Sequence, residues 1–518
     1  MSDYSANSSE SDIEKNPNPA RRKTTIESRK DLPVALKREN AIYSDRSTQL
    51  TINTLAVAGG RDYVNKRLSR YAGESKIEWE GGNRSDGSGV TGRKQQSHSF
   101  PYAGRIVDKI DQYVFSTSPT RDGLAEEIAA DMSADGKSID QLMKAADGYL
   151  TSCGWCWIGV DSPNLNGKQI SVTEKNAQKI RPYWNVYSPL AVKDWKYDAI
   201  GELEWLITET VSTESTTVDA EPQTFIIRRI WERGIVRTVK LTKDKAGKLG
   251  KYSDETVSIS YTGVPFVMVG HAQAGGHTFD DIESINRTIM DLESVNRANF
   301  FKRAYPQPVL PASVIQNTAD AYGTDSTGAA DLIFGLGSPI LVSPEDKDPM
   351  YLMPAASDMG AIRVEIQQLK MNMFDSVGLM LKNESKQVAS AESKAWDFLD
   401  VAMVMKARAQ TLQEAEAEAA KITSQFDSSI PEWTPVYNTD FDIGDFQQEI
   451  NALVMAGNVP MPVEMSQMVL TKLADRLDRL GAAVTPEDRE IIMESIRNFD
   501  PTALTIESME NLQATPEP

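Results

Sequence analysis

The chain has 518 residues, with 55 lysines and arginines against 74 aspartates and glutamates, and a formal net charge of −19. At 40% hydrophobic and 25% charged residues its composition is that of a folded globular protein, which excludes global disorder. The acidic balance argues against a surface that coats nucleic acid, because affinity for phosphate comes mainly from lysine and arginine. It remains compatible with a protein past which a polyanion slides without sticking.

The chain contains no run close to the roughly 20 apolar residues that a membrane helix needs. Residues 1–15 lack the apolar core of a signal peptide. We therefore expect no membrane partner, and assembly in the cytoplasm. Cys153 and Cys156 are the two cysteines of the sequence, so no disulfide framework is expected.

The first 40 residues are polar and carry few large apolar side chains. Such a segment cannot bury enough surface to offset the entropy cost of ordering it, so we expect a disordered arm over residues 1–40. Its Arg21–Lys23 cluster is able to contact nucleic acid, although an ordinary solvated tail explains it better. The last residues, 506–518, are expected to be a disordered tail.

Helical and extended patterns are mixed over residues 41–278. Ile106 and Ile110 lie at helical spacing after Pro101, and a second helix is expected over Ser138–Tyr149. The apolar run Trp155–Val160 then predicts a buried strand.

From about residue 183 to residue 269, β-branched and aromatic runs alternate with turn residues, which is typical of a meander. The expected strands are Trp184–Tyr187, Leu203–Val211, Thr224–Glu232, Ile235–Leu241, Val257–Tyr261 and Val264–Val269. We therefore predict the α+β fold class, with an antiparallel sheet in this part of the chain.

The pattern changes past Phe279. Apolar residues then repeat at spacings of three and four, which predicts a helix over residues 281–303, about 35 Å long. A stretch of roughly 50 residues follows without helical pattern, with prolines near its start and two apolar runs, Leu332–Phe334 and Ile340–Val342, that we expect to pair as short strands. A second amphipathic helix is predicted over Ser357–Val377.

The polar loop 378–389 separates this second helix from a third helical segment, Ser390–Thr423, which is rich in alanine and glutamate. A helix of that length spans about 50 Å. Shorter helices are expected towards the C-terminus, one of them over about Ile443–Ala456. One of them begins at Thr485–Pro486, where threonine suits the N-cap and proline the first helical position.

The sequence shows no strong catalytic or metal-binding pattern. Its three histidines, His98, His271 and His277, are scattered, and no histidine and cysteine cluster has metal-ligand spacing. The tripeptide 136–138, Gly-Lys-Ser, lacks the earlier glycine of a phosphate-binding loop. We predict no enzyme activity, no catalytic residue, no metal and no cofactor.

The spacing of Cys153 and Cys156 is that of a redox motif and is the sharpest enzymatic signal in the chain. A reactive first cysteine belongs at a helix N-terminus, where the dipole stabilises its thiolate. Here the pair closes a helix and enters a strand, with Gly154 as the break. We therefore interpret both cysteines as small buried apolar residues.

The order of these segments resembles that of the portal (head-to-tail connector) proteins of tailed double-stranded DNA bacteriophages. In that family an α+β wing precedes a stem helix, a clip, a second stem helix, a tunnel loop, a long wing helix and a helical crown. Residues 282–303, IESINRTIMDLESVNRANFFKR, are similar to the first stem helix. The implied domains are an arm (1–40), wing (41–278), stem helix 1 (279–304), clip (305–356), stem helix 2 (357–377), tunnel loop (378–389), long wing helix and return (390–440), crown (441–505) and tail (506–518).

The resemblance implies a homo-oligomeric ring, typically of twelve copies, at one vertex of the capsid in the virion. Double-stranded DNA passes through such a ring during packaging by the terminase motor and again during genome ejection. The implied partners are terminase, the major capsid and scaffolding proteins and a head-tail adaptor protein. The family has no catalytic signature.

Three groups of site residues follow from the resemblance. The tunnel loop contacts DNA through Lys382, Asn383, Lys386 and Gln387. The stem residues that line the channel or bridge subunits are Arg287, Glu293, Arg363, Glu365 and Lys370. The clip residues that join subunits are Leu332, Ile333, Phe334, Ile340 and Leu341. The apolar stripes of both stem helices are narrow, which suits packing against neighbours in a ring.

Two other interpretations remain open. A non-viral structural protein with a coiled coil explains the long helix of residues 390–423, but not the proline-rich insertion or the meander. A thiol oxidoreductase that uses Cys153 and Cys156 is the enzymatic alternative.

Overall fold

A computed structural model of the chain describes residues 34–71, 73–83, 89–163, 180–215, 221–243, 249–304, 307–311, 340–342, 350–352, 356–377, 391–439, 441, 463, 465–468, 470–471, 474 and 486–498. These residues form two compact units. The larger unit lies within Met1–Phe115, Pro119–Lys382 and Arg408–Tyr437, and the smaller within Ser116–Ser118, Asn383–Ala407 and Asn438–Pro518.

The larger unit begins with a group of helices, α1 to α7, called the helical group below. In α1 (Ala41–Ala58) the side chain of the N-cap, Asn40, accepts a hydrogen bond from the Ile42 backbone N–H at 3.0 Å. α7 (Ile139–Cys153) begins with a capping box between Ser138 and Gln141. The other elements here are α2 (Gly60–Arg67), α3 (Lys76–Glu80), β1 (Gly81–Asn83), β2 (Gly89–Thr91), α4 (Arg93–Gln96), α5 (Tyr102–Val114), β3 (Thr120–Asp122) and α6 (Glu126–Ala130).

The predicted break from helix to buried strand is confirmed. Gly154 ends α7 in the left-handed conformation, with φ at 87°, and β4 (Trp155–Asp161) follows at once with its first six residues buried. β4 is the central strand of an antiparallel sheet, between β11 (Phe266–Gly270) and β5 (Tyr183–Tyr187).

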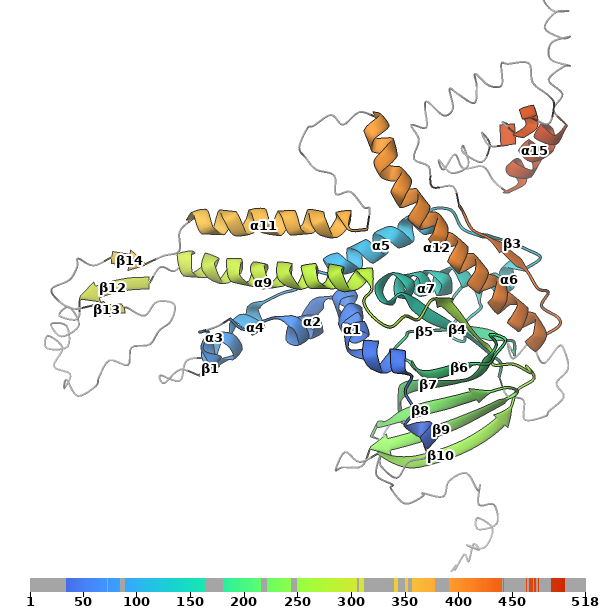
Figure 1. Cartoon of the computed structure of the whole chain (residues 1–518), viewed down its shortest axis with the longest axis horizontal. Helices are drawn as coiled ribbons and strands as arrows, with labels where there is room; N and C mark the ends of the chain where they lie inside the picture. Colours follow the sequence, from blue (N-terminus) through green and yellow to red (C-terminus); the bar gives the residue numbers. More distant parts are fainter. Residues whose placement is uncertain are drawn as a thin grey trace, which may run out of the picture. The chain divides into compact units, whose positions relative to one another are not determined.

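The meander folds into a five-stranded sheet in the order β10-β9-β8-β7-β6, and every neighbouring pair is antiparallel (Figure 1). The α+β fold class with an antiparallel sheet is therefore confirmed. The strands are β6 (Val192–Tyr197), β7 (Leu203–Glu214), β8 (Gln223–Glu232), β9 (Ile235–Lys243) and β10 (Leu249–Ser258).

Two strands of this sheet differ from the sequence prediction. β6 is missing from the prediction because three of its six residues are charged. The predicted strand Val257–Tyr261 is wrong, since β10 ends at Ser258 and begins at Leu249. Within the described residues β10 pairs with β9 alone and forms an edge of the sheet, so its many polar residues remain solvated while one side of its backbone is paired.

Large aromatic side chains hold the sheets to the helices. Trp157 of β4 meets Trp195 of β6 edge to face, with ring centroids 5.7 Å apart, and Trp231 of β8 meets Phe266 of β11 at 5.1 Å. Leu50 of α1 is fully buried in the same cluster. Indole and phenyl rings bury the largest apolar area per residue, so this cluster is the main core of the unit.

The expected disordered arm ends earlier than residue 40. Val34–Leu36 form a short 3-10 helix, and Leu36, 2% exposed, packs with Ile207, Ile230, Val239 and Leu241 of the five-stranded sheet. Arg228 of β8 donates a hydrogen bond to the Leu36 carbonyl oxygen. Leu36, the last residue of the apolar run Val34–Leu36, thus anchors this stretch to a sheet formed much later in the chain, a contact that local composition does not reveal.

Three helices dominate the second half of the chain, and they confirm the three predicted long helices. They are α9 (Thr278–Ala304), α11 (Ala356–Asp375) and α12 (Ala391–Phe426). Between α9 and α11 lies a small sheet in the order β13-β12-β14, made of β12 (Gln307–Pro311), β13 (Ile340–Val342) and β14 (Met350–Leu352). After α12, β15 (Thr434–Val436) pairs with β3.

In the smaller unit, α15 (Pro486–Arg497) begins at Pro486, as its capping sequence predicts. The Gln467 side chain donates to the Arg497 carbonyl oxygen at 2.8 Å. The predicted helix near residues 443–456 lies outside the described residues. None of the described helices has the length and apolarity needed to cross a membrane.

A buried cluster of charged residues joins α12 to the helical group. Arg408 of α12 donates to the carboxylate and carbonyl of Asp147 and to the Thr151 hydroxyl. Asp147 is fully buried, and its second carboxylate oxygen and Oδ1 of Asp111 on α5 have no partner among the described residues. Burial and the Asp147 carboxylate raise the pKa of Asp111 to about 9, so Asp111 holds a proton at neutral pH.

Replacing Asp111 by asparagine tests this assignment. Because the folded-state pKa exceeds the ordinary value of 3.8, the wild-type protein loses stability as pH rises from about 4 towards about 9. Asp111→Asn supplies a neutral donor at every pH, so its urea midpoint should fall less between pH 5 and pH 9. Asp45→Asn, at an exposed position of α1, is the control and should follow the wild type. A D111N profile parallel to the wild type contradicts the assignment.

Candidate functional site: the paired helices α9 and α11

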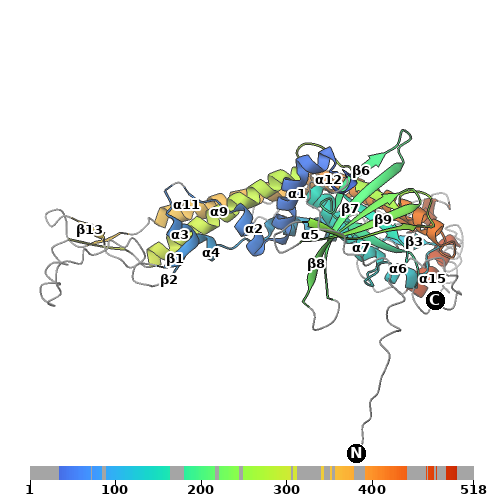
Figure 2. The same ribbon diagram turned by 90° about the horizontal axis from the view of Figure 1, so that it is seen from below.

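α9 and α11 run side by side in opposite directions, and the three-stranded sheet β13-β12-β14 joins their far ends (Figures 1 and 2). On α11, Met359, Ile366 and Met373 are buried at intervals of seven residues. This spacing places one side chain on the same face every two turns, the seam of a two-helix contact. The predicted apolar stripe of α11 is therefore present.

The prediction that the stripe of α9 is reserved for neighbouring subunits is wrong for its first half. Ile282 and Ile289 are each 1% exposed and are buried within this chain, where α1, α5, α7 and α11 contact α9. The stripe looks narrow in sequence because polar residues also lie in the contact. Glu283, 1% exposed, accepts hydrogen bonds from the Tyr63 hydroxyl and from Arg67 at 2.8 Å.

A buried cation, Arg93, fixes the middle of α9. Arg93 of α4 donates to Glu74 at 2.7 Å and to the Ser294 hydroxyl at 2.7 Å, and its guanidinium lies 3.8 Å from the centre of the Tyr71 ring. A guanidinium held by a carboxylate, a hydroxyl and an aromatic face has little freedom to move. α9 is thus attached to the helical group at two points along its length.

Glu293 and Lys370, two of the predicted stem residues, contact each other across the helix pair. Lys370 Nζ lies 3.6 Å from Glu293 Oε1 and 4.3 Å from the centre of the Tyr102 ring. The Tyr102 hydroxyl donates to Glu293 at 3.3 Å. Burial raises the pKa of Glu293, while Lys370 counteracts this change. The cluster bridges α5, α9 and α11.

The other three predicted stem residues lie in different surroundings. Arg287 donates to the Ser69 hydroxyl at 2.6 Å, close to Asp291 on its own helix. Arg363 and Glu365 are exposed on α11, and neither has an ion-pair partner in the described part of the chain. Arg363 and Glu365 therefore remain available to another molecule.

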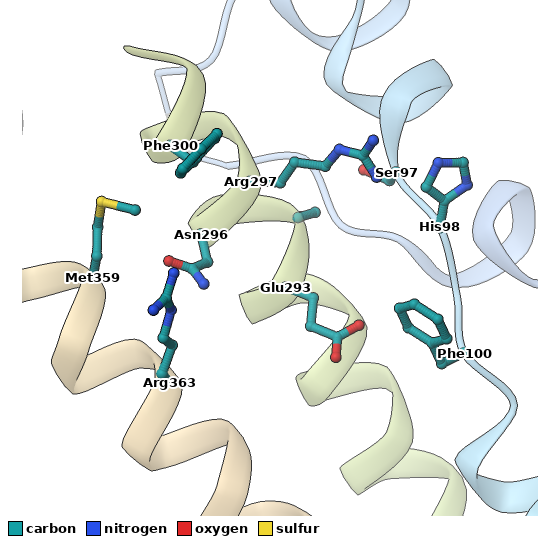
Figure 3. Close-up of a pocket in the computed structure, with 10 residues that line it drawn as sticks. Ser97, His98, Phe100, Glu293, Asn296, Arg297, Phe300, Met359 and Arg363 are labelled. Atoms are coloured by element: carbon teal, nitrogen blue, oxygen red, sulfur yellow. The ribbon is translucent and has the colours of Figure 1, made fainter. Parts of the chain in front are cut away.

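A pocket of about 280 Å³ opens beside α9 (Figure 3). Arg363 extends from α11 towards Asn296, and Arg297 extends from α9 towards Ser97. Two phenylalanines at its border are about half exposed, Phe100 at 52% and Phe300 at 55%. Arg297 also lacks a carboxylate partner within the described ranges. The pocket thus combines apolar rings with two guanidinium groups.

Sequence reasoning missed Tyr102, Arg93 and Arg297. Tyr102 lies one residue after the proline that marks α5, and the other two sit in polar surroundings typical of solvated surface. None of them carries a local signal, because each acquires its role from contacts with segments some 200 residues away.

The tunnel-loop residues Lys382, Asn383, Lys386 and Gln387 lie outside the described residues, as do Leu332, Ile333 and Phe334 of the clip. Ile340 and Leu341 lie on β13, which pairs in parallel with Val309 and Leu310 of β12. β12 also pairs with β14 in the antiparallel direction. β13 and β14 are therefore the outer strands of this sheet.

The two cysteines give no support to thiol chemistry. Cys153 and Cys156 are both fully buried. Burial raises the pKa of both thiols, which disfavours the nucleophilic thiolate. Within the described ranges no group of three or more His, Cys, Asp or Glu side chains is placed to hold a metal ion.

No family model matches the sequence, and the search of curated proteins finds no match. Among solved structures, the chain is similar to one described as "Virion of native gene transfer agent (GTA) particle", with TM-score 0.38, 11% identity, and 81% of this chain and 98% of that chain covered.

Two further similar structures are described as the neck of such a particle. The neck of the empty particle, computed with C6 symmetry, aligns with TM-score 0.36 and 11% identity, covering 71% of this chain and 90% of that chain. The neck of the native particle, computed with C12 symmetry, aligns with TM-score 0.33 and 12% identity, covering 76% and 89%. TM-scores below 0.5 do not establish a common fold, so the functional assignment depends on the geometry of this chain.

Substitutions in α11 test the helix pair. Ile366→Ala removes a side chain that is 7% exposed and should lower the free energy of unfolding by about 2–4 kcal/mol. Val364→Ala, at a position that is 72% exposed on the same helix, is the matched control and should change it by less than about 0.5 kcal/mol. Urea titration measures both values. Equal effects of the two substitutions contradict the described seam.

Proposed function

We propose that this chain is a portal protein of a phage-like particle. Copies of it form a ring at one vertex of the capsid, through which genomic DNA enters and later leaves. The observation that carries the proposal is the order of elements around α9 and α11. An α+β domain is followed by one long helix, a small β insertion, an antiparallel helix against the first, and then the 36-residue helix α12.

The exposed face of α11 suits a surface past which DNA moves. Val364, Gln367 and Gln368 are exposed there beside one cation, Arg363, and one anion, Glu365. A mixed face without a cationic cluster binds phosphate weakly, and the net charge of −19 per copy repels DNA at close range. We assign this face, with Arg363, to the channel, and Arg297 of α9 to the contact with a neighbouring copy.

The segment between α11 and α12 provides the tunnel loop of this proposal. Lys382, Asn383, Lys386 and Gln387 lie in it, and repetition around a ring brings all copies of the two lysines to one level of the channel. Such a ring of ammonium groups makes contacts with passing phosphates that weaken as salt rises.

The β insertion provides the clip. Because β13 and β14 are short outer strands, a strand from another copy is able to extend the sheet at either edge. Leu332, Ile333, Phe334, Ile340 and Leu341 are the proposed subunit contacts of this region. The head-tail adaptor protein binds there in the assembled particle.

The remaining assignments complete the proposal. Residues 41–278 with the long helix form the wing, and residues 441–505 form the crown. The ring assembles in the host cytoplasm with major capsid and scaffolding proteins, receives the terminase motor during packaging, and stays in the virion. The proposed chain performs no catalysis and binds no cofactor.

The molecular mass of the purified protein in solution tests the proposed ring of twelve copies. Twelve copies of 57.2 kDa make about 690 kDa, whereas a coiled-coil dimer has about 115 kDa. Light scattering coupled to gel filtration should give a mass near the larger value. A stable species of one or two copies over a range of salt and protein concentrations contradicts the proposal.

A double substitution tests the tunnel loop. Lys382→Gln with Lys386→Gln removes two charges per copy and should leave the mass of the ring unchanged while altering DNA packaging or retention. Lys370→Gln, which instead breaks the contact with Glu293, is the control for loss of a stem charge. Particle yield and packaged DNA are measured together. Wild-type packaging by the double variant rules out the assigned role of the loop.

A further inference from the structure

Arg297 of α9 and Glu365 of α11 are exposed charged residues of opposite sign on the same helix pair. Neither has a partner of opposite charge among the described residues. A solvated charge by itself indicates no function. These two are informative because they lie on opposite sides of the pair, as their positions on the two helices show.

Glu365 and the pocket beside α9 lie on opposite sides of the helix pair. Successive residues of a helix project about 100° apart, so Arg363 and Glu365 project about 160° apart around α11. The direction of the buried Ile366, which faces α9, lies between them. Arg363 lines the pocket (Figure 3), and Glu365 therefore belongs to the other side of the pair.

Partly exposed apolar residues flank Glu365 on its side of α11. Ile362 lies three residues before it and Leu369 four residues after it, and both are partly exposed. Residues at these spacings share one face of a helix. The side of the pair away from the pocket thus presents a row of an apolar side chain, a carboxylate and a second apolar side chain.

The pocket side presents the complementary pattern. Arg297 lines the pocket together with Phe100 and Phe300, which are each about half exposed (Figure 3). The acidic residue of the lining, Glu293, is already engaged by Lys370. The charge of Arg297 is therefore left without a counterpart in the pocket, and the apolar rings beside it are left partly uncovered.

In the proposed ring, the two sides of the helix pair become two subunit contacts. With α11 towards the hole and α9 behind it, one side faces the preceding copy and the other faces the following copy. Rotation about the ring axis leaves the height of every residue unchanged. Arg363 and Glu365 are about 3 Å apart along α11, and Arg363 lines the same pocket as Arg297. Glu365 of one copy is thus level with the pocket of the next when the pair runs along the channel.

We propose that Glu365 of one copy enters the pocket of the next copy and pairs with its Arg297. Ile362 and Leu369 then pack against the exposed phenylalanine rings. Guanidinium and carboxylate groups form strong charge-assisted hydrogen bonds, and aromatic residues and arginine are enriched in protein interfaces. The inference rests on the proposed ring and adds the pair of residues that orders its copies. Because each copy gives one carboxylate and receives one, the contact is head-to-tail and continues until the ring closes.

Charge reversal tests the pair. Glu365→Arg sets two guanidinium groups against each other, and Arg297→Glu sets two carboxylates against each other. Each single variant should raise the protein concentration at which half of the rings dissociate by about tenfold, and the loss should shrink as salt rises. The double variant Arg297→Glu with Glu365→Arg restores an opposite pair and should recover the wild-type value. Light scattering over a dilution series measures all of them. Both positions are exposed, so the fold of the single chain is preserved.

A mismatched swap is the control. Lys109→Glu with Glu365→Arg has the same net charge as the double variant, but Lys109 is an exposed residue of α5 that does not line the pocket. It should stay as weak as Glu365→Arg alone. Equal recovery in both swaps, no recovery in either, or single variants that assemble like the wild type overturn the pair and leave the proposed ring standing. A wild-type protein that stays at one or two copies overturns both.

Discussion

The contact between α9 and α11 is the interaction on which the rest of the arrangement depends. Residues 305–355 leave from the end of α9 and return at the start of α11, so the small sheet β13-β12-β14 stays at the far end of the pair only while the two helices remain together. Met359, Ile366 and Met373 provide that cohesion through apolar burial, and Glu293 with Lys370 adds a polar contact across the same interface.

Buried carboxylates determine which distant segments meet. Glu283, Asp147 and Glu416 are each 1% exposed or less, and each is bound by an arginine, respectively Arg67, Arg408 and Arg121. The pairs join residues 216, 261 and 295 positions apart. Removing charges from water is costly, so such pairs add little net stability, but an unpaired charge in the same place costs much more. They therefore specify one arrangement of the elements and penalise alternatives.

The long helices were predictable from sequence, because the repeats of Ile282 and Ile289 and of Met359, Ile366 and Met373 are local patterns with one geometric meaning. The break at Gly154 was also predictable, from a glycine between a helical and an extended run. The full extent of strand β10 was not predictable from sequence, since an edge strand needs no apolar alternation. The burial of Leu36 was not predictable either, because it depends on a sheet formed some 170 residues later.

In the candidate site, too, positions on a helix were predictable from sequence, whereas contacts between distant segments were not. Lys370 and Glu293 were identified as stem residues by their place on the helices, yet their contact with each other and with Tyr102 requires the packing of three helices.

In the proposed assembly, copies of this chain surround an opening bordered by their α9 and α11 helices. Electron microscopy of the purified assembly measures this most directly. We expect a closed ring with a central hole and with the helix pairs of all copies arranged around it, α11 facing the hole. A solid particle, or a ring in which these pairs point away from the axis, contradicts it.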